Sequence, residues 1–306
     1  MLGSRAFGSI SRTDRLRLIL AAASWGTGTA VSKHAVNEIP PLLLLAIQLT
    51  SSLVLLAIVM RAAGLPLRGS PPTLARLGVL NPGIAYALGL AGLTYITASL
   101  SVLLWAVEPI FILLAAALVL GESIGAGIIG LSVVAAGGMG LVVLGPGIGG
   151  DWPGIVLTLV GVGFCAAYTV IARRSVAGAD STAQVVLAQQ GNALAIVIPV
   201  LAVAFAAGGL GPIAPSPGGL LSAIASGILY YSAAYWFYLG ALRSVPASIA
   251  AASFYLIPVF GLAASALLLG ERLQTYQWLG VGVVVIAVAL IVRPQAGVRR
   301  ASPEPA

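Results

Sequence analysis

Charged residues are scarce in this chain of 306 residues, because only 8% of its positions are Asp, Glu, Lys or Arg, whereas 59% are hydrophobic. Soluble globular proteins carry about 25% charged residues. So few charges cannot cover the surface of a water-soluble protein of this length. The composition excludes a cytosolic enzyme, a nucleic-acid-binding module and a disordered scaffold, and it predicts an integral membrane protein.

Cysteine and histidine each occur once, as Cys165 and His34. A single cysteine inside an apolar run provides neither a disulfide framework nor a cysteine-based metal site. The sequence contains no phosphate-binding loop motif and no cluster of metal-ligand residues, and its only histidine lies at a predicted membrane edge. We therefore expect no cofactor, no metal and no catalytic residues, and no nucleotide hydrolysis by the chain itself.

Long apolar runs fill most of the chain instead. A helix needs about 20 mainly apolar residues to cross the hydrocarbon core of a bilayer. The runs are too long and too continuously apolar for the alternating strands of an outer-membrane barrel. Hydropathy thus predicts an all-α integral membrane fold with ten transmembrane helices, at residues 18–36, 41–60, 74–95, 98–120, 124–144, 153–171, 183–205, 220–242, 247–269 and 278–292.

The basic residues orient these helices. If the N-terminus lies inside, every Lys and Arg except Lys33 and Arg272 falls on the cytoplasmic side, as the positive-inside rule requires. The sequence therefore predicts that both termini are cytoplasmic, and it assigns the basic pI of about 10.0 to topology and not to a nucleic-acid partner. Cleavage of residues 18–30 as a signal peptide is the disfavoured alternative, because it would leave nine spans.

The two halves of the chain form an internal repeat. When residues 80–122 are set against residues 229–271, more than a third of the positions are identical without a gap, and Tyr86 matches Tyr235. Each repeat holds five predicted helices, an odd number, so the second repeat must enter the membrane in the opposite orientation. Inverted repeats are the architecture of secondary transporters, in which the substrate site lies between the repeats and access alternates between the two sides.

Each half carries a Pro-X-Phe motif upstream of a Gly-Glu step at the end of its fourth helix, and the first helix carries Ser24-Trp25-Gly26 and a later Lys33. With these motifs the chain resembles the EamA-type drug/metabolite transporter superfamily. The resemblance implies five-helix repeats at residues 16–145 and 152–293, followed by a cytoplasmic tail at 294–306. It also implies a ten-helix transporter, often an exporter, with a central cavity lined by helices 1, 3, 4, 6, 8 and 9.

Glu108 is the main candidate for chemistry. A carboxylate in the middle of a spanning helix is costly, so it must face the protein interior or be protonated. Its repeat counterpart is Ile257, so the acid breaks the symmetry of the repeats. We predict that Glu108 binds a substrate amine or takes up a coupling proton. The alternative is a protonated carboxyl group that only stabilises helix packing.

Aromatic residues are predicted to flank this acid from both halves. Ser101, Trp105 and Glu108 share one helix face, and Trp105 matches Phe254 in the other repeat. Such a pocket suits an apolar or aromatic solute with a cationic group, although ordinary packing is the alternative. The predicted substrate-binding residues are Trp25, Tyr86, Ser101, Trp105, Glu108, Tyr231, Tyr235 and Phe254.

The residues predicted to act in coupling and gating are Glu108, Lys33, Pro109 and Pro258. Each proline is predicted in the middle of a helix, where it frees a carbonyl group and forms either a hinge or a static kink. Lys33 is predicted near the outer boundary, as part of an outer gate or as a side chain that only snorkels to water. Glu122 and Glu271 are predicted to anchor helix ends at opposite faces.

Together these features predict a secondary transporter of the bacterial cytoplasmic (inner) membrane that exports amino acids or related small metabolites and drugs by alternating access. Its partners are a small-molecule substrate, the lipid bilayer and, if the substrate gradient does not suffice, protons. Metabolite uptake is the alternative within transport. An intramembrane enzyme or a membrane scaffold subunit is a weaker alternative from another class, because the sequence supplies a single intramembrane acid.

Overall fold

The computed structural model of the protein describes residues 11–108, 110–112, 126–143, 150–175, 181–210, 213–242, 253–272 and 274–292. Within these ranges the chain is helical and forms no strand. The four helices that are long and apolar enough to cross a membrane are Pro41–Ala62, Pro72–Tyr95, Ala183–Ala206 and Pro217–Tyr238. The predicted all-helical membrane fold is confirmed to this extent, whereas the full set of ten spans and their orientation stay predictions.

Two helices of the first half, α1 (Arg12–Val36) and α5 (Ala98–Trp105), begin at side-chain caps. The described elements of this half are α1, α2 (Pro41–Ala62), α3 (Pro72–Arg76), the 3-10 turn η1 (Leu77–Val79), the π-helical segment η2 (Leu80–Ile84), α4 (Ala85–Tyr95), α5 and α7 (Ala126–Val143). Ser11 caps α1 by accepting a hydrogen bond from the backbone N–H of Asp14. Thr97 caps α5 in the same way, so that backbone donors of the first turn are satisfied.

The second half repeats this organisation. It contains α8 (Trp152–Ser175), α9 (Thr182–Ala206), α10 (Pro217–Gly227), the π-helical segment η4 (Ile228–Ala233), α11 (Ala234–Leu242), the 3-10 turn η5 (Ser253–Tyr255), α13 (Leu256–Leu269) and α14 (Thr275–Val292). Ser216 caps α10. Gly270 follows the end of α13 with a φ of +68°, a left-handed conformation in which glycine commonly ends helices.

The π-helical segments lie at equivalent positions of the two repeats. η2 starts at Leu80 and η4 contains Leu229, which is its counterpart in the repeat alignment. Inside η2, Asn81 has extended dihedral angles (φ −143°, ψ 118°), so the helical path is interrupted there. Segments of π-helix are rare and frequently occur at functional sites. Both third helices of the repeats are therefore irregular at the same depth.

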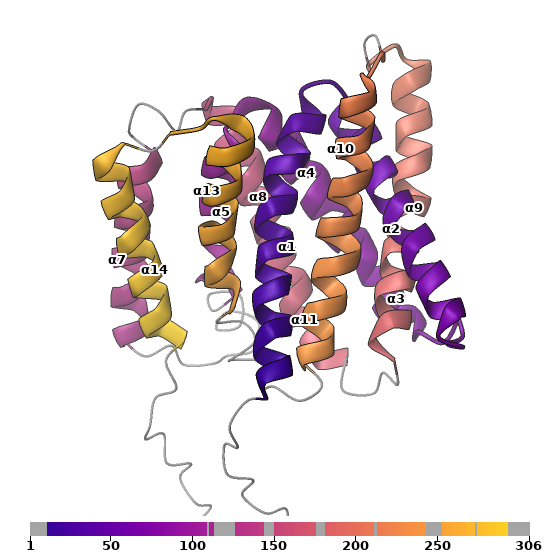
Figure 1. Cartoon of the computed structure of the whole chain (residues 1–306), viewed down its shortest axis with the longest axis horizontal. Coiled ribbons are helices and arrows are strands. Elements are labelled where there is room, and N and C mark those ends of the chain that lie inside the picture. Colours follow the sequence, from indigo (N-terminus) through magenta and orange to yellow (C-terminus); the bar gives the residue numbers. More distant parts are fainter. Residues whose placement is uncertain are drawn as a thin grey trace, which may run out of the picture.

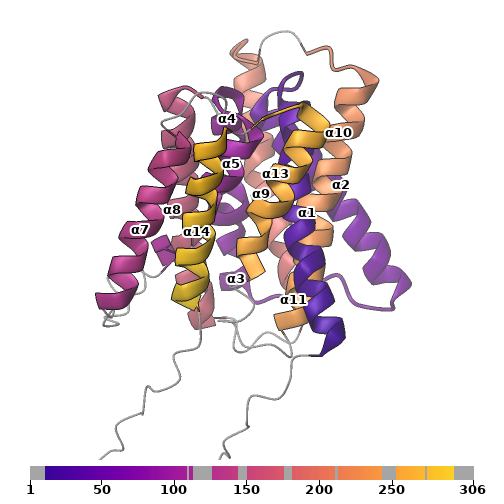
Figure 2. The same ribbon diagram turned by 60° about the vertical axis from the view of Figure 1, so that its left-hand side comes forward.

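The two halves interlock by exchanging their first helices. α1 packs along α10, α11 and α13 of the second half, whereas α8 packs along α4 and α5 of the first half (Figure 1). The other helices pair with their counterparts: α2 lies against α9, and α7 lies beside α14 (Figure 2). Large apolar side chains such as Leu267, Val203 and Phe205 remain 68–85% exposed, which is expected of a surface that faces lipid.

Candidate substrate site

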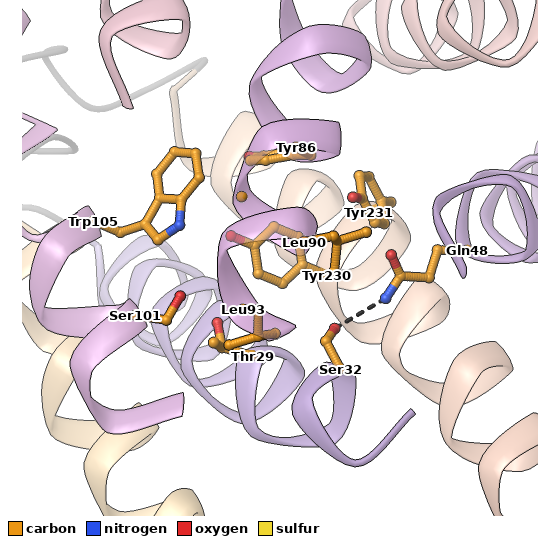
Figure 3. Close-up of a pocket in the computed structure, with 11 residues that line it drawn as sticks. Thr29, Ser32, Gln48, Tyr86, Leu90, Leu93, Ser101, Trp105, Tyr230 and Tyr231 are labelled. Carbon is orange, nitrogen blue, oxygen red and sulfur yellow. Dashed lines mark hydrogen bonds between the residues drawn. The ribbon is translucent and has the colours of Figure 1, made fainter. Parts of the chain in front are cut away.

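A small cavity lies where α1, α2, α4, α5 and η4 meet (Figure 3). Its volume is about 30 Å³, which is enough for one or two water molecules. Residues of both halves form its wall. The lining residues are Thr29, Ser32, Gln48, Tyr86, Gly89, Leu90, Leu93, Ser101, Trp105, Tyr230 and Tyr231. None of these side chains carries a formal charge at neutral pH.

Aromatic rings packed around Tyr86 form one wall of the cavity. The ring centroid of Tyr86 lies 5.4 Å from that of Trp105, 5.2 Å from that of Tyr230 and 5.4 Å from that of Tyr231. Gly89 allows a close approach here, because a Cβ atom at this position would lie 3.0 Å from the Trp105 ring, which is tighter than an ordinary contact. The arrangement brings together three of the predicted site residues, Tyr86, Trp105 and Tyr231, and adds Tyr230.

Repeat counterparts meet beside this wall. The hydroxyl groups of Tyr86 and Tyr235 are 3.1 Å apart and form a hydrogen bond. Tyr235 belongs to a second aromatic cluster, in which the Trp25 ring lies 5.5 Å from Tyr235 and 5.3 Å from Phe254. The structure therefore places the predicted residues Trp25, Tyr235 and Phe254 next to the cavity wall, in a cluster that is not part of the cavity lining.

Polar groups line the opposite side. Gln48 reaches from α2 and donates hydrogen bonds through Nε2 to Ser32 Oγ (2.9 Å) and to Ser226 Oγ (2.8 Å). Ser32 belongs to α1 and Ser226 to α10, so one amide group joins three helices from both halves. Ser101, a predicted site residue, also lines the cavity and is buried.

Glu108 lies outside the cavity lining, three residues beyond Trp105. Its Oε1 accepts a hydrogen bond from the Cys165 thiol of α8 at 3.1 Å, and Asn81 Nδ2 donates to the same sulfur at 3.1 Å. Asn81, Cys165 and Glu108 thus form a polar chain that joins η2, α8 and the region after α5. A turn at Ala106 separates α5 from Glu108, so the predicted helix face does not continue regularly to the acid.

Two predicted residues lie at the upper end of the bundle, where α1 ends in Figure 1. Lys33 is predicted to belong to a gate, and Glu271 is predicted to anchor a helix end. Lys33 Nζ donates a 2.7 Å hydrogen bond to the Leu93 carbonyl oxygen near the end of α4. The Glu271 carboxylate accepts hydrogen bonds from the backbone N–H groups of Ala98 and Ser99, both at 2.9 Å. A side chain just beyond the end of α13 therefore holds the start of α5 in the other half.

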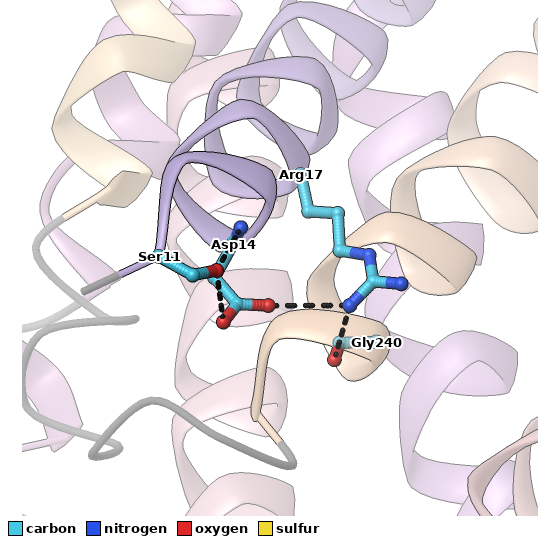
Figure 4. A network of polar contacts seen from close by, with 4 residues as sticks. All are labelled: Ser11, Asp14, Arg17 and Gly240. Carbon is cyan, nitrogen blue, oxygen red and sulfur yellow. Dashed lines mark hydrogen bonds and ion pairs between the residues drawn. The ribbon is translucent and has the colours of Figure 1, made fainter.

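The lower end is tied by Arg17 (Figure 4). Its guanidinium group contacts Asp14 Oδ1 at 3.2 Å within α1 and donates to the carbonyl oxygen of Gly240 in α11 at 3.4 Å. This contact also joins the two halves. Cross-half contacts therefore lie at both ends of the bundle, with the small cavity between them.

The predicted gating proline of the second half, Pro258, is the third residue of α13, which begins at Leu256 directly after η5. The predicted helix starts at residue 247, and its residues before 253 lie outside the described ranges. The role of Pro258 as a hinge or a static kink stays a prediction. Pro109 and Glu122 lie outside the described residues.

Sequence reasoning missed several residues of the site. Gln48, Ser32 and Tyr230 line the cavity, and Asn81 and Cys165 contact each other beside Glu108. Gln48 carried a usable signal, because it is an amide group inside an otherwise apolar run, and polar residues in spanning segments face the protein interior. Ser32 and Asn81 carried weaker signals, because small polar residues also occur at ordinary helix contacts.

Comparisons with known proteins agree with this fold. A solved structure described as "Crystal structure of protein" aligns with a TM-score of 0.64 over 93% of this chain and 99% of that chain. The sequence identity is 20%, so the likeness concerns the fold alone. A comparison with curated proteins found no match.

A family model gives a more specific result. The model of the EamA-like transporter family matches residues 16–144 and, separately, residues 152–293. The two matches cover most of the chain, one in each half, and they agree with the resemblance identified from the Pro-X-Phe and Gly-Glu motifs. The chain therefore belongs to the EamA-like transporter family and is a membrane transporter.

Proposed function

We propose that the protein is a secondary transporter of the bacterial cytoplasmic membrane that exports amino acids or related small metabolites and drugs by alternating access. The proposal rests on one observation above all. The cavity lies between two interlocked halves, at the place where the repeat counterparts Tyr86 and Tyr235 touch. A site at such an interface can be exposed to either side when one half tilts against the other.

Inverted orientation of the two repeats is part of this proposal. The exchange of α1 and α8 between the halves, and the pairing of α2 with α9 and of α7 with α14, support a two-fold relation in the membrane plane. The distribution of arginine and lysine supports cytoplasmic termini. In this orientation the upper end, with Lys33 and Glu271, faces the outside, and the end with Arg17 faces the cytoplasm.

The small volume of the cavity and the cross-half contacts at both ends support a carrier mechanism over a channel. The cavity admits no more than a water-sized group, and cross-half contacts occur both above it, at Glu271, and below it, at Arg17. A carrier must pass through a state in which its site is closed to both sides. A channel would instead keep a continuous path. The aromatic wall favours a solute with an apolar body.

Transport can be tested in bacteria that overproduce the protein. Cells are grown on a panel of toxic amino-acid analogues and cationic drugs, and an empty vector and the Trp105→Ala variant serve as controls. Export predicts raised tolerance to one chemical class, which the loss of the Trp105 wall reduces while the amount of protein in the membrane is unchanged. Growth equal to the empty vector on every compound would contradict export.

Metabolite uptake is the second candidate, since an alternating-access carrier follows the gradients of its substrate. The same growth panel separates the two directions. Uptake predicts that cells with the protein become more sensitive to a toxic analogue than cells with the empty vector. Import of the labelled compound into those cells would then be measured directly.

A further inference from the structure

Gln48 has an unusual hydrogen-bonding state. Within the described residues, four buried side-chain polar atoms have no hydrogen-bond partner: Trp25 Nε1, Gln48 Oε1, Asn81 Oδ1 and Ser265 Oγ. Only Gln48 among these residues lines the central cavity. Its amide oxygen points toward Leu90 and Tyr231, which line the same cavity (Figure 3). A buried carbonyl oxygen without a donor is unfavourable, and a donor supplied by a ligand would relieve this.

The neighbours of Gln48 fix which end of the amide faces the cavity. Ser226 Oγ donates its single proton to the carbonyl oxygen of Ala223 at 3.0 Å. Ser226 can therefore only accept from Gln48, and this places Nε2 of the amide toward Ser226 and Ser32. In this hydrogen-bond pattern the amide oxygen faces away from both serines.

The remaining cavity wall favours positive charge over negative charge. Tyr86, Trp105 and Tyr230 present aromatic rings, whose faces attract cations, and Thr29 and Ser101 present hydroxyl oxygens. No basic side chain belongs to the lining that the structure describes. A carboxylate placed here would meet an amide oxygen and aromatic faces, without a basic side chain of the lining to pair with it. Lys33, whose Nζ donates to the carbonyl oxygen of the lining residue Leu93, is already bonded there.

We infer that Gln48 Oε1 accepts a hydrogen bond from the ammonium group of the transported solute, and that the substrates are small primary amines with an apolar body. The inference rests on the proposed transport function, since it takes the cavity as the transport site. In the closed state the cavity of about 30 Å³ admits the ammonium group alone. The apolar body occupies the space that opens when the two halves separate.

Binding of two matched probes to the purified full-length protein tests the inference. The probes are 2-phenylethylamine and its N,N,N-trimethyl derivative, which has the same charge but no N–H donor. Dissociation constants are obtained from the shift of thermal unfolding with probe concentration. Gln48→Leu removes the amide at similar volume, and Gln48→Glu keeps an acceptor at this position.

Gln190→Leu is the matched control. Gln190 is a second buried glutamine of the interior, but its Oε1 accepts from Ser52 and its Nε2 donates to the Tyr231 carbonyl oxygen. It does not line the cavity. Its removal therefore disturbs packing and hydrogen bonding to a similar degree, while Gln48 and its amide oxygen are kept. Gln190 reaches the cavity lining only through the backbone carbonyl oxygen of Tyr231.

We expect Gln48→Leu to raise the dissociation constant of the amine about tenfold or more and to leave that of the trimethyl probe unchanged. Gln48→Glu should retain amine binding, and Gln190→Leu should keep the wild-type ratio between the probes. An equal loss of both probes in Gln48→Leu, or no amine binding to the wild type, would overturn the inference. Amine binding that depends on Gln48 without transport in cells would instead refute the proposed function alone.

Discussion

At the scale of single residues, the polar chain of Asn81, Cys165 and Glu108 stands apart from the aromatic cavity. A thiol is a weak donor, so the hydrogen bond from Cys165 compensates little for placing a carboxyl group in the membrane interior. Such a group can change its protonation when the surrounding helices move. This arrangement agrees with the predicted role of Glu108 in coupling, and it sets the acid apart from the cavity lining.

The Glu108→Gln variant tests this role. Glutamine keeps an oxygen at the position that accepts from Cys165, so the fold should be unchanged, whereas no proton can be taken up. We expect proteoliposomes with the variant to lose the pH dependence of transport. Tyr86→Phe, which alters the cavity wall and not the acid, is the control. A variant that transports with the pH dependence of the wild type would exclude proton coupling through Glu108.

Residue positions could be predicted from sequence only in part. From the sequence we selected aromatic and hydroxyl residues by their type, their helix face and their match between the repeats. Four of these residues line the cavity: Tyr86, Ser101, Trp105 and Tyr231. Which other aromatic residues share that cavity depends on helix rotation, which hydropathy does not encode. Gln48 was not selected, because the repeat alignment that guided the selection does not extend to α2.

At the scale of elements, hydropathy predicted the third helix of each repeat, but it did not predict the π-helical segment inside that helix. The spans at residues 74–95 and 220–242 agree with the helices, yet both contain a π-helical segment. Asn81 and Pro82 in the first repeat have no counterpart in the second, where Tyr230 and Tyr231 occupy the same positions. The two segments share a position in the repeat, but their residues differ, and extended dihedral angles interrupt η2 at Asn81. Hydropathy does not encode such local irregularity.

The contact between α1 and α13 depends on the absence of a side chain at Gly26. A Cβ atom there would lie 2.5 Å from the carbonyl oxygen of Ile257 and 2.6 Å from the backbone nitrogen of Gly261, and backbone atoms cannot move aside as side chains do. We expect Gly26→Ala to destabilise the fold by about 1–3 kcal/mol, measured as thermal unfolding in detergent.

Gly163→Ala in α8 provides the comparison for Gly26→Ala, because no atom lies within 4 Å of an added Cβ there. Alanine favours helix over glycine by up to about 1 kcal/mol, so this variant should be as stable as the wild type or more stable. Equal stability of the two variants would contradict a close α1–α13 contact.

A loop carboxylate connects the end of α1 to the start of α10. Glu38 accepts a 2.7 Å hydrogen bond from the backbone N–H of Ser216. Hydrogen bonds from Ser216, with a smaller contribution from the nearby His34, lower the pKa of Glu38. A lowered pKa in the folded state means that this contact stabilises the fold at neutral pH and is lost as the pH falls below the ordinary range of a glutamate.

Acidification should therefore weaken the contact between Glu38 and Ser216 and lower the stability of the fold. We expect the unfolding temperature of the wild type to fall more between pH 7 and about pH 3 than that of Glu38→Gln, which lacks the titrating group. Asp151→Asn changes a loop carboxylate away from this corner and should keep the wild-type slope. The same slope in Glu38→Gln as in the wild type would show that the contact does not contribute.

At the scale of the whole molecule, the small cavity and the cross-half contacts at both ends agree with one state of the proposed alternating-access cycle. At the upper end, the Glu271 carboxylate accepts from two backbone N–H groups at the start of α5, where the helix dipole is positive. In the proposed cycle, opening toward the upper end would require this contact to break. Its removal should therefore favour the state that opens there.

The Glu271→Ala variant tests this in the purified protein. The S101C substitution, made in a C165S background, places a cysteine in the cavity. This cysteine should react slowly with a bulky maleimide while the cavity volume is about 30 Å³. Charge-assisted hydrogen bonds contribute about 1.5–3 kcal/mol, and about 1.4 kcal/mol corresponds to a tenfold change in population. We expect Glu271→Ala to raise the labelling rate at least about tenfold. Asp151→Ala removes an acid next to the end of α4 without releasing α5, and it should leave the rate near that of the parent. A rate that rises equally in both variants would mean general loosening of the bundle and not release of a gate.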